Sequence, residues 1–185
     1  MLRGMERSTL AHEIAKVALL RGTFTLRSGK TSHYYLDKYL FSTRPEILRE
    51  LGRLFAERLP PGTVRLAGAE LGGIPLVSAA SMASGLPCLF VRNARKDYGT
   101  SKQLEGHLDK GDRVVFVEDV ATTGGQALEA VKVLREAGAR VTHVICTIDR
   151  QEGARANVEA AGVAFDALFT VQDLGIVPDA ATTAR

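Results

Sequence analysis

From residue 63 onward, short apolar runs alternate with segments of helical periodicity, and this alternation restricts the fold more than any other feature of the sequence. The apolar runs predict strands near residues 63–68, 87–92, 113–118, 140–148 and 163–170. The segments between them predict helices near residues 73–84, 124–137 and 151–161. Strands joined through helices form right-handed units with parallel strands that are buried on both faces. The sequence therefore predicts an α/β fold with a mainly parallel, twisted sheet and helices on both faces.

The residues before this alternation predict a small N-terminal hood and one more helix. Apolar positions between Ser8 and Arg21 share one helical face, and Gly22 suits the position after a helix end. Residues 23–41 mix aromatic, β-prone and turn residues, which indicates short strands, so we expect the hood to extend from residue 1 to about residue 41. The stretch from Thr43 to Glu46 has the pattern of a capping box with proline in the first turn, and it predicts a helix that ends near residues 60–62.

Residues 93–112 are polar and rich in glycine, and they show no helical pattern between two predicted strands. Long loops of this kind are uncommon inside compact domains and often act as active-site lids, although a surface hairpin without function has the same composition. A chain of 185 residues is long enough for one α/β core and too short for two ordinary domains. We therefore expect a single domain over residues 1–185, with the hood and a flexible lid loop as appendages.

Composition and charge argue against several classes of protein. No apolar run approaches the roughly 18 residues of a membrane span, and the N-terminus lacks the apolar core of a signal peptide. We therefore expect a cytoplasmic protein without a membrane partner. The net charge of +3 arises from dispersed basic residues, which favours an enzyme for anionic substrates over a nucleic-acid-binding protein. Cys88 and Cys146 stand alone in apolar segments, which indicates buried thiols and predicts no metal site.

Polar clusters follow three of the predicted strands, at residues 68–73, 118–126 and 149–153. In an open parallel sheet, ligands bind in the crevice outside the carboxyl ends of the strands. We therefore expect the three clusters to line one crevice.

The middle cluster combines two acids, Glu118 and Asp119, with a Thr-Thr-Gly-Gly turn that opens a predicted helix. Backbone NH groups at a helix start bind phosphate. The sequence has neither a Lys-Ser or Lys-Thr pair after these glycines nor a G-x-G-x-x-G motif, which disfavours a nucleoside triphosphate or a dinucleotide. A ribose 5-phosphate would satisfy both halves of the cluster, since a carboxylate can hold the sugar hydroxyls and stabilise positive charge at the anomeric carbon. In the alternative interpretation, the two acids only cap the following turn.

The stretch VVFVEDVATTGG resembles the phosphoribosyl diphosphate signature of the type I phosphoribosyltransferases, an acid pair after a strand followed by a Thr-Gly phosphate loop. Four further stretches are more specific: FTLRSGKTSHYYL, GAELGGIPL, RKDYG and IDRQEG. In this order, over roughly residues 20–155, they resemble the orotate phosphoribosyltransferases.

The resemblance implies an activity, a cofactor and an assembly. The implied reaction transfers the 5-phosphoribosyl group from 5-phosphoribosyl 1-diphosphate (PRPP) to orotate, giving orotidine 5′-monophosphate and diphosphate in de novo pyrimidine (UMP) biosynthesis. The implied cofactor is Mg²⁺, carried by the diphosphate without a dedicated protein cage. The implied assembly is a homodimer in which the lid serves the neighbouring subunit's site.

The resemblance also implies roles for individual residues. Lys96 and Asp119 are the expected catalytic residues, with Lys96 neutralising charge on the leaving diphosphate. The expected PRPP-binding residues are Arg92, Lys96, Tyr98, Glu118, Asp119, Val120, Ala121, Thr122, Thr123, Gly124, Gly125 and Gln126. The expected orotate-binding residues are Tyr35, Leu36, Thr122 and Arg150, and secondary contacts are expected from Arg27, Gly72 and Gly73. A guanidinium can grip the carboxylate of orotate, whereas the alternative for Arg150 is an ion pair with Glu152.

The sequence departs from the family pattern at Gly72 and Asn93, where many relatives have lysine, and at Tyr98, where many have histidine. Two rival functions follow from the same residues. A purine or uracil phosphoribosyltransferase would share the phosphate loop but would not need Arg150. A PRPP-sensing regulatory protein that binds nucleic acid should have lost the lid cations, yet Arg92 and Lys96 are present here.

Overall fold

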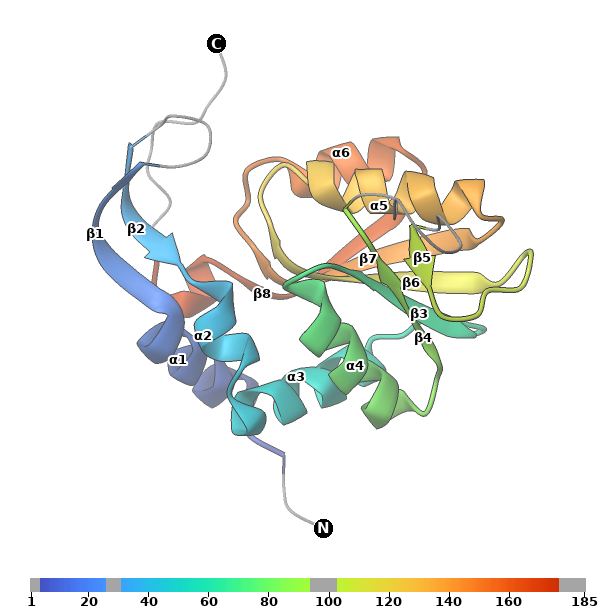
Figure 1. The fold of residues 1–185 in the computed structure, drawn as a ribbon. Helices are drawn as coiled ribbons and strands as arrows, with labels where there is room; N and C mark the ends of the chain where they lie inside the picture. The colour runs from blue at the N-terminus through green and yellow to red at the C-terminus, as the bar shows by residue number, and fades with distance from the viewer. Residues whose placement is uncertain (1–3, 26–30, 94–102, 177–185) are drawn as a thin grey trace.

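A six-stranded sheet forms the centre of the molecule in the computed structural model, which describes residues 4–25, 31–93 and 103–176 (Figure 1). In spatial order the strands are β5 (Leu104–Glu105), β4 (Cys88–Val91), β3 (Arg65–Ala69), β6 (Arg113–Ala121), β7 (Arg140–Asp149) and β8 (Ala164–Thr170). Neighbouring strands are parallel except that β5 pairs antiparallel with β4. The predicted mainly parallel sheet is confirmed. Strand β5 is an addition, because its residues lie in the loop that was expected to lack structure.

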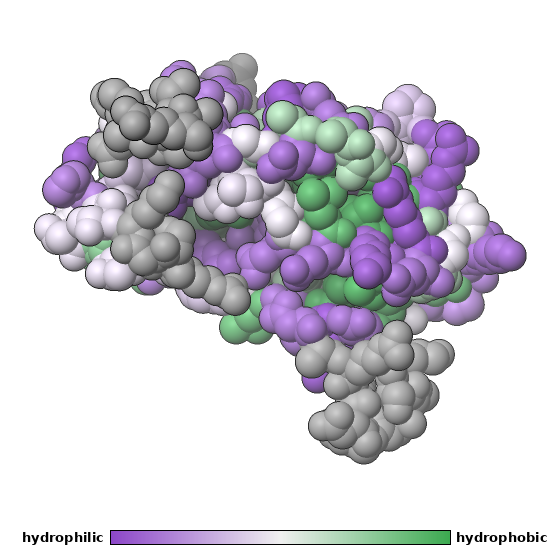
Figure 2. Space-filling view, turned by 90° about the horizontal axis from the view of Figure 1, so that it is seen from above, coloured by the Kyte–Doolittle hydropathy of each residue, from purple (hydrophilic) through white to green (hydrophobic). Residues whose placement is uncertain are grey.

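Helices cover both faces of this sheet, as the sequence predicts. Helices α3 (Pro45–Glu57) and α4 (Gly73–Ser84) lie on one face, and α5 (Gly125–Glu136) and α6 (Ala154–Ala160) lie on the other (Figure 1). Successive residues of β6 alternate between the two cores: Val115 packs with the α3 and α4 side chains, and Phe116 packs with those of α5 and α6. Both faces of the central strand are therefore buried, which explains its unbroken apolar run. Figure 2 looks down on the α5 and α6 side, where hydrophilic residues predominate around a smaller hydrophobic area.

The hood consists of α1 (Arg7–Ala18), the antiparallel pair β1 (Leu19–Thr25) and β2 (Thr31–Leu36), and α2 (Lys38–Ser42). The predicted first helix was too long, because its last three residues, 19–21, pair with β2 instead. Gly22 therefore lies inside a strand and does not follow a helix end. The expectation of strands up to residue 41 was also wrong, because the Asp37 side chain accepts a hydrogen bond from the Tyr39 backbone at 3.0 Å and starts α2.

Other element boundaries also differ from the prediction, and α3 ends at Glu57 instead of near residues 60–62. Thr43 does not cap α3; its hydroxyl donates to the Tyr39 carbonyl at 2.6 Å and closes α2, while Pro45 occupies the first turn of α3 as expected. Strand β6 continues past residue 118 to Ala121, so both acids of the middle cluster lie within the strand. Helix α6 starts only at Ala154, after Gly153 with its positive φ of 104°.

The C-terminal part of the described chain ties the hood to the sheet. The short 3-10 helix η1 (Gln172–Leu174) follows β8, and the Arg7 guanidinium of α1 donates to the Leu168 carbonyl and pairs with Asp173 at 2.9 Å. The hood is thereby held beside the carboxyl ends of the strands. Within the described residues, no helix is long and apolar enough to span a membrane.

Candidate active site

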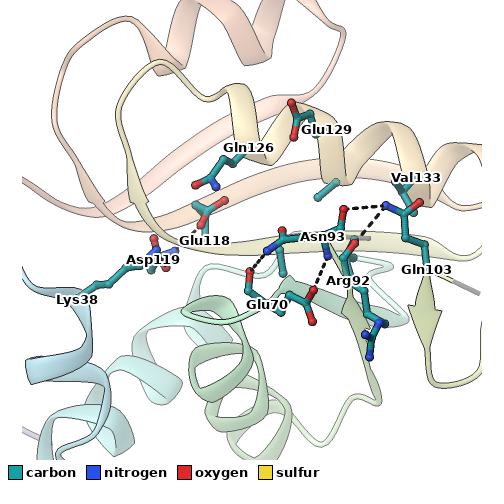
Figure 3. Close-up of a pocket in the computed structure, with 13 residues that line it drawn as sticks. Lys38, Glu70, Arg92, Asn93, Gln103, Glu118, Asp119, Gln126, Glu129 and Val133 are labelled. Atoms are coloured by element: carbon teal, nitrogen blue, oxygen red, sulfur yellow. Dashed lines mark hydrogen bonds and ion pairs between the residues drawn. The ribbon is translucent and has the colours of Figure 1, made fainter. Parts of the chain in front are cut away.

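A cavity of about 330 Å³ opens at the carboxyl ends of β3 and β6, where two of the three polar clusters meet (Figure 3). It is lined by Lys38, Ala69, Glu70, Val91, Arg92, Asn93, Gln103, Glu118, Asp119, Gln126, Glu129, Ala130 and Val133. Four of the expected site residues are therefore brought together in one hollow: Arg92, Glu118, Asp119 and Gln126. The third cluster, with Arg150, lies next to it at the end of β7, which pairs with β6.

The two tandem acids are both buried, although neighbouring strand residues point to opposite faces. The residue Asp119 is only 2% exposed. Its Oδ2 lies 2.7 Å from Nζ of Lys38, which reaches across from α2 (Figure 3). The Glu118 carboxylate accepts a hydrogen bond from the Asp119 backbone at 3.0 Å. One acid is thus neutralised by a cation from the hood, and the other faces the cavity beside it.

Burial of Glu118, together with the negative charge of Asp119, raises the pKa of Glu118 from 4.5 to about 8. The same neighbourhood acts on Lys38: burial alone would lower its pKa, but the Asp119 carboxylate outweighs this effect and raises it. At neutral pH Glu118 therefore favours its protonated form, beside the ion pair that Lys38 forms with Asp119. A protonated Glu118 can donate a hydrogen bond to a ligand oxygen, which an ionised one cannot.

Replacing Glu118 with glutamine should change how stability depends on pH. The pKa of Glu118 is raised in the folded state, so the wild-type protein loses stability as pH rises from about 4.5 to about 8. Glutamine does not ionise, so the difference in unfolding free energy between variant and wild type should grow in favour of the variant by up to about 1.4 kcal/mol per pH unit in this window. Urea unfolding at pH 5, 6, 7 and 8 measures it.

The matched control is Glu136→Gln, because Glu136 is an exposed α5 residue paired with Lys132 at 3.9 Å. The difference in unfolding free energy between Glu136→Gln and the wild type should stay constant over the same pH series. A constant difference for Glu118→Gln as well would show that Glu118 is ionised in the free protein.

The conformation of the loop after the acids requires glycine, and hydrogen bonds from α6 hold one side of the loop. Gly124 has a positive φ of 79°, and a Cβ there would lie 3.0 Å from Val158, so other residues would be strained. The loop carbonyls of Thr122 and Thr123 accept hydrogen bonds from the Ala154 backbone and the Asn157 side chain at 3.1 and 2.9 Å. Because α6 holds these carbonyls, and α5 begins at the next glycine, the amide groups of the first α5 turn are available for an anion.

Arg150 is held by two neighbours from different parts of the chain. Its Nε lies 2.8 Å from Glu152, its Nη2 donates to the Tyr34 hydroxyl at 3.0 Å, and its guanidinium stacks 5.1 Å from the centre of the Tyr34 ring. The ion pair with Glu152 that was the alternative interpretation is present. However, the Arg150 side chain is only 11% exposed, so the guanidinium is fixed in place at the strand end and is not an ordinary surface group.

The hood carries the two residues expected to bind orotate, Tyr35 and Leu36, and their role stays a prediction. Tyr35 is 44% exposed and packs against Phe24 at a centroid distance of 5.7 Å, whereas the Leu36 side chain is buried in the core, so that only its backbone could face a ligand. Tyr34 is the hood residue that reaches Arg150.

The turn at residues 68–73, which holds the expected secondary contacts Gly72 and Gly73, is closely packed. A Cβ on Gly68 would lie 2.7 Å from the Gly73 carbonyl, and one on Gly72 would lie 1.8 Å from Oδ2 of Asp119. Gly68 is therefore required, because the clash there is with backbone, whereas a side chain at position 72 would have to displace the Asp119 carboxylate. The Glu70 carboxylate at the middle of the turn accepts a hydrogen bond from the Asn93 backbone at 2.7 Å (Figure 3).

Some expected site residues lie outside the part of the chain that the structure describes, and some residues that line the cavity were not predicted. Arg27, Lys96 and Tyr98 lie outside the described residues. Lys38, Gln103 and Glu129 line the cavity but were not predicted. The charged pair Asp37 and Lys38 inside the stretch YYLDKYLF, which is otherwise apolar and aromatic, was the available signal for Lys38.

Comparison with known proteins agrees with this geometry. The phosphoribosyl transferase domain family matches the chain over residues 42–172, and the chain belongs to this family. The orotate phosphoribosyltransferase of Methanocella arvoryzae is 48% identical over 83% of this chain and 87% of its own length. That of Methanocaldococcus jannaschii is 44% identical over 91% of this chain and 97% of its own length.

A solved structure gives the same result. The crystal structure of Mycobacterium tuberculosis orotate phosphoribosyltransferase in complex with PRPP is 31% identical and has a TM-score of 0.78, covering 92% of this chain and 99% of that one. Within the phosphoribosyltransferases, the chain therefore falls among the orotate phosphoribosyltransferases, which confirms the resemblance stated from its motifs.

Proposed function

We propose that the chain transfers the 5-phosphoribosyl group from PRPP to orotate, releasing diphosphate and giving orotidine 5′-monophosphate for pyrimidine biosynthesis. The observation that carries this proposal is the order of groups along the strand ends. The buried acids Glu118 and Asp119 are followed, after two intervening residues, by the Thr-Thr-Gly-Gly turn and the start of α5, and Arg150 stands at the end of the neighbouring strand. Sugar hydroxyls, phosphate and a carboxylated base match these groups in that order.

In the proposed mechanism the protein holds and polarises its substrates. The acids Glu118 and Asp119 bind the ribose hydroxyls, and the segment from Val120 and Ala121 through Thr122, Thr123, Gly124 and Gly125 to Gln126 binds the 5-phosphate. The bond between the anomeric carbon and the diphosphate oxygen then breaks as an anionic nitrogen of orotate bonds to that carbon. The Asp119 carboxylate stabilises the positive charge that develops on the ribose. No protein nucleophile is required.

Orotate recognition is assigned to Arg150, with Thr122, Tyr35 and Leu36 beside it. Stacking on the Tyr34 ring fixes the plane of the Arg150 guanidinium. Two N–H donors in that plane match the two oxygens of a carboxylate. The exposed Tyr35 ring can cover one face of the base, and the Leu36 backbone can read its edge. Neither a purine nor uracil carries the carboxylate that such an arginine would bind.

Magnesium is proposed to arrive on the diphosphate. Within the described ranges, no group of three or more His, Cys, Asp or Glu side chains could hold a metal ion by itself. Mg²⁺ keeps several waters and binds readily through substrate phosphates, so the cavity oxygens of Glu118 and Asp119 suit an ion that is already bound to PRPP. When bound, the ion would supply neutralisation of the leaving diphosphate.

The remaining proposals concern the lid and the assembly. Lys96 is proposed to neutralise charge on the leaving diphosphate, with Arg92, Tyr98 and the hood residue Arg27 as further phosphate contacts and the turn at Gly72 and Gly73 beneath it. The lid would serve the neighbouring subunit of a cytoplasmic homodimer and exclude water, since hydrolysis of PRPP is the competing reaction.

An assay of product formation tests the proposed function. Purified protein is supplied with PRPP, Mg²⁺ and one base at a time from orotate, uracil, adenine, hypoxanthine and guanine. We expect a nucleoside monophosphate with orotate only, because Arg150 requires a carboxylate partner. Turnover of a purine or uracil without turnover of orotate would contradict the proposal.

A further inference from the structure

The turn at residues 68–73 carries no cation of its own, although it lines the part of the site proposed for a diphosphate. Its sequence is Gly-Ala-Glu-Leu-Gly-Gly, and its only charged side chain is the acid Glu70. Gly72 cannot be replaced by a longer residue in this arrangement, because a Cβ there would meet Asp119 at 1.8 Å and the Cε of Lys38 at 3.1 Å. The space beside Gly72 is therefore filled by Asp119 and Lys38.

Lys38 reaches this space from the hood, which comes from a distant part of the chain. Its Nζ lies 2.7 Å from Oδ2 of Asp119, its side chain is 30% exposed, and it lines the cavity together with Glu70, Arg92 and Glu118 (Figure 3). Among these groups, Lys38 is the cation in direct contact with the acid pair. A partly exposed ammonium can hold the carboxylate and face an incoming anion at once, since it has three donors.

We propose that Lys38 is a positioning residue for PRPP: it fixes the Asp119 carboxylate and supplies, beside Gly72, the positive charge that the turn lacks. The inference rests on the proposed function. Without Lys38, the Asp119 carboxylate would face a substrate that carries a diphosphate with no cation to neutralise it, and the repulsion would weaken binding of that substrate. Orotate contacts at Arg150 would be unaffected, because Lys38 does not line that part of the site.

The test compares three variants by titration calorimetry with PRPP and Mg²⁺, which needs no turnover, and by steady-state kinetics. Lys38→Met should raise both the Kd and the KM for PRPP about tenfold or more while leaving the KM for orotate within about twofold. Lys38→Arg should restore part of the loss. Lys132→Met is the matched control, because Lys132 is an exposed lysine paired with Glu136 outside the cavity, and it should leave every constant unchanged.

A second variant probes the same contact without removing the charge. Gly72→Ala places a Cβ where the Asp119 carboxylate now lies, so it should also raise the Kd for PRPP, and the double variant Lys38→Met/Gly72→Ala should bind no more weakly than the weaker single variant. Additive losses, or Lys38→Met with unchanged PRPP constants, would overturn the proposal. If Lys38→Met lowered only the melting temperature, Lys38 would be a tether for the hood. Absence of turnover in the wild type would contradict the proposed function and leave the calorimetric test of Lys38 in force.

Discussion

Replacing Asp119 with asparagine should lower kcat/KM for PRPP by about 10²–10³-fold, the loss typical for one preorganised electrostatic group. The side chain is buried at the end of β6 and forms an ion pair with Lys38 at 2.7 Å. Asparagine keeps its shape but removes the negative charge, so neither the ribose hydroxyls nor the developing positive charge would meet a carboxylate. The loss should appear in kcat as well as in KM, because the charge develops only during bond breaking.

Asp166→Asn is the matched control for this variant. Asp166 also lies in a strand, accepts a hydrogen bond from the next backbone amide at 2.8 Å and pairs with a cation, Arg58, at 3.3 Å, but it does not line the cavity. We expect its kinetic constants to match those of the wild type. If Asp119→Asn retained more than about a tenth of wild-type kcat/KM, the carboxylate would have no place in the mechanism.

Lys96→Ala should lower turnover by two or more orders of magnitude without changing the fold, since neutralisation of a leaving diphosphate contributes several kcal/mol to such a reaction. Arg150→Ala should also be nearly inactive, through loss of orotate binding. If the lid acts across a dimer, mixing the two inactive variants should restore part of the activity, because a hybrid dimer contains one site with both residues intact. Activity is measured before and after subunit exchange.

Subunit exchange itself is followed with a differently tagged copy, so that recovery and exchange are scored separately. Exchange with no recovery would show that each lid serves its own subunit. Near-normal activity of Lys96→Ala alone would remove that residue from the mechanism.

The central sheet could be predicted because its signal is local. Each strand is an apolar run between turn residues. Because parallel strands are buried on both faces, such a run identifies a strand without knowledge of its neighbours in the sheet. The acid pair and the Thr-Gly-Gly turn could be predicted for a related reason, since Glu118 to Gly125 are adjacent in sequence and their chemistry is adjacent in space. The alternative that the acids only cap a turn does not fit their position inside β6.

The hood was predicted less well because its structure depends on distant pairing. Residues 19–21 have helical periodicity, but β2 offers them backbone partners, and Leu19 pairs with Leu36. Asp37 and Thr43 each have side chains that compete for nearby backbone groups, and together they form the short α2 that no periodicity announced.

The missed contacts of the site are all contacts between segments far apart in sequence. Lys38 contacts Asp119, and Tyr34 contacts Arg150. The residues of each pair are too far apart in sequence for a motif spacing to predict their contact. Gly72 stands where many relatives have lysine, so the sequence shows only that this lysine is missing. The fold shows that Lys38 fills the space beside Gly72. Local motifs thus predict the ribose and phosphate groups, while the cation and the aromatic support depend on tertiary structure.

A crystal structure with PRPP, Mg²⁺ and an unreactive orotate analogue tests the central claim most directly. We expect the ribose hydroxyls on Glu118 and Asp119, the 5-phosphate on the amide groups at the start of α5, and the analogue's carboxylate on Arg150. A 5-phosphate bound away from the Thr-Gly-Gly turn, or ribose hydroxyls that do not touch either acid, would contradict it.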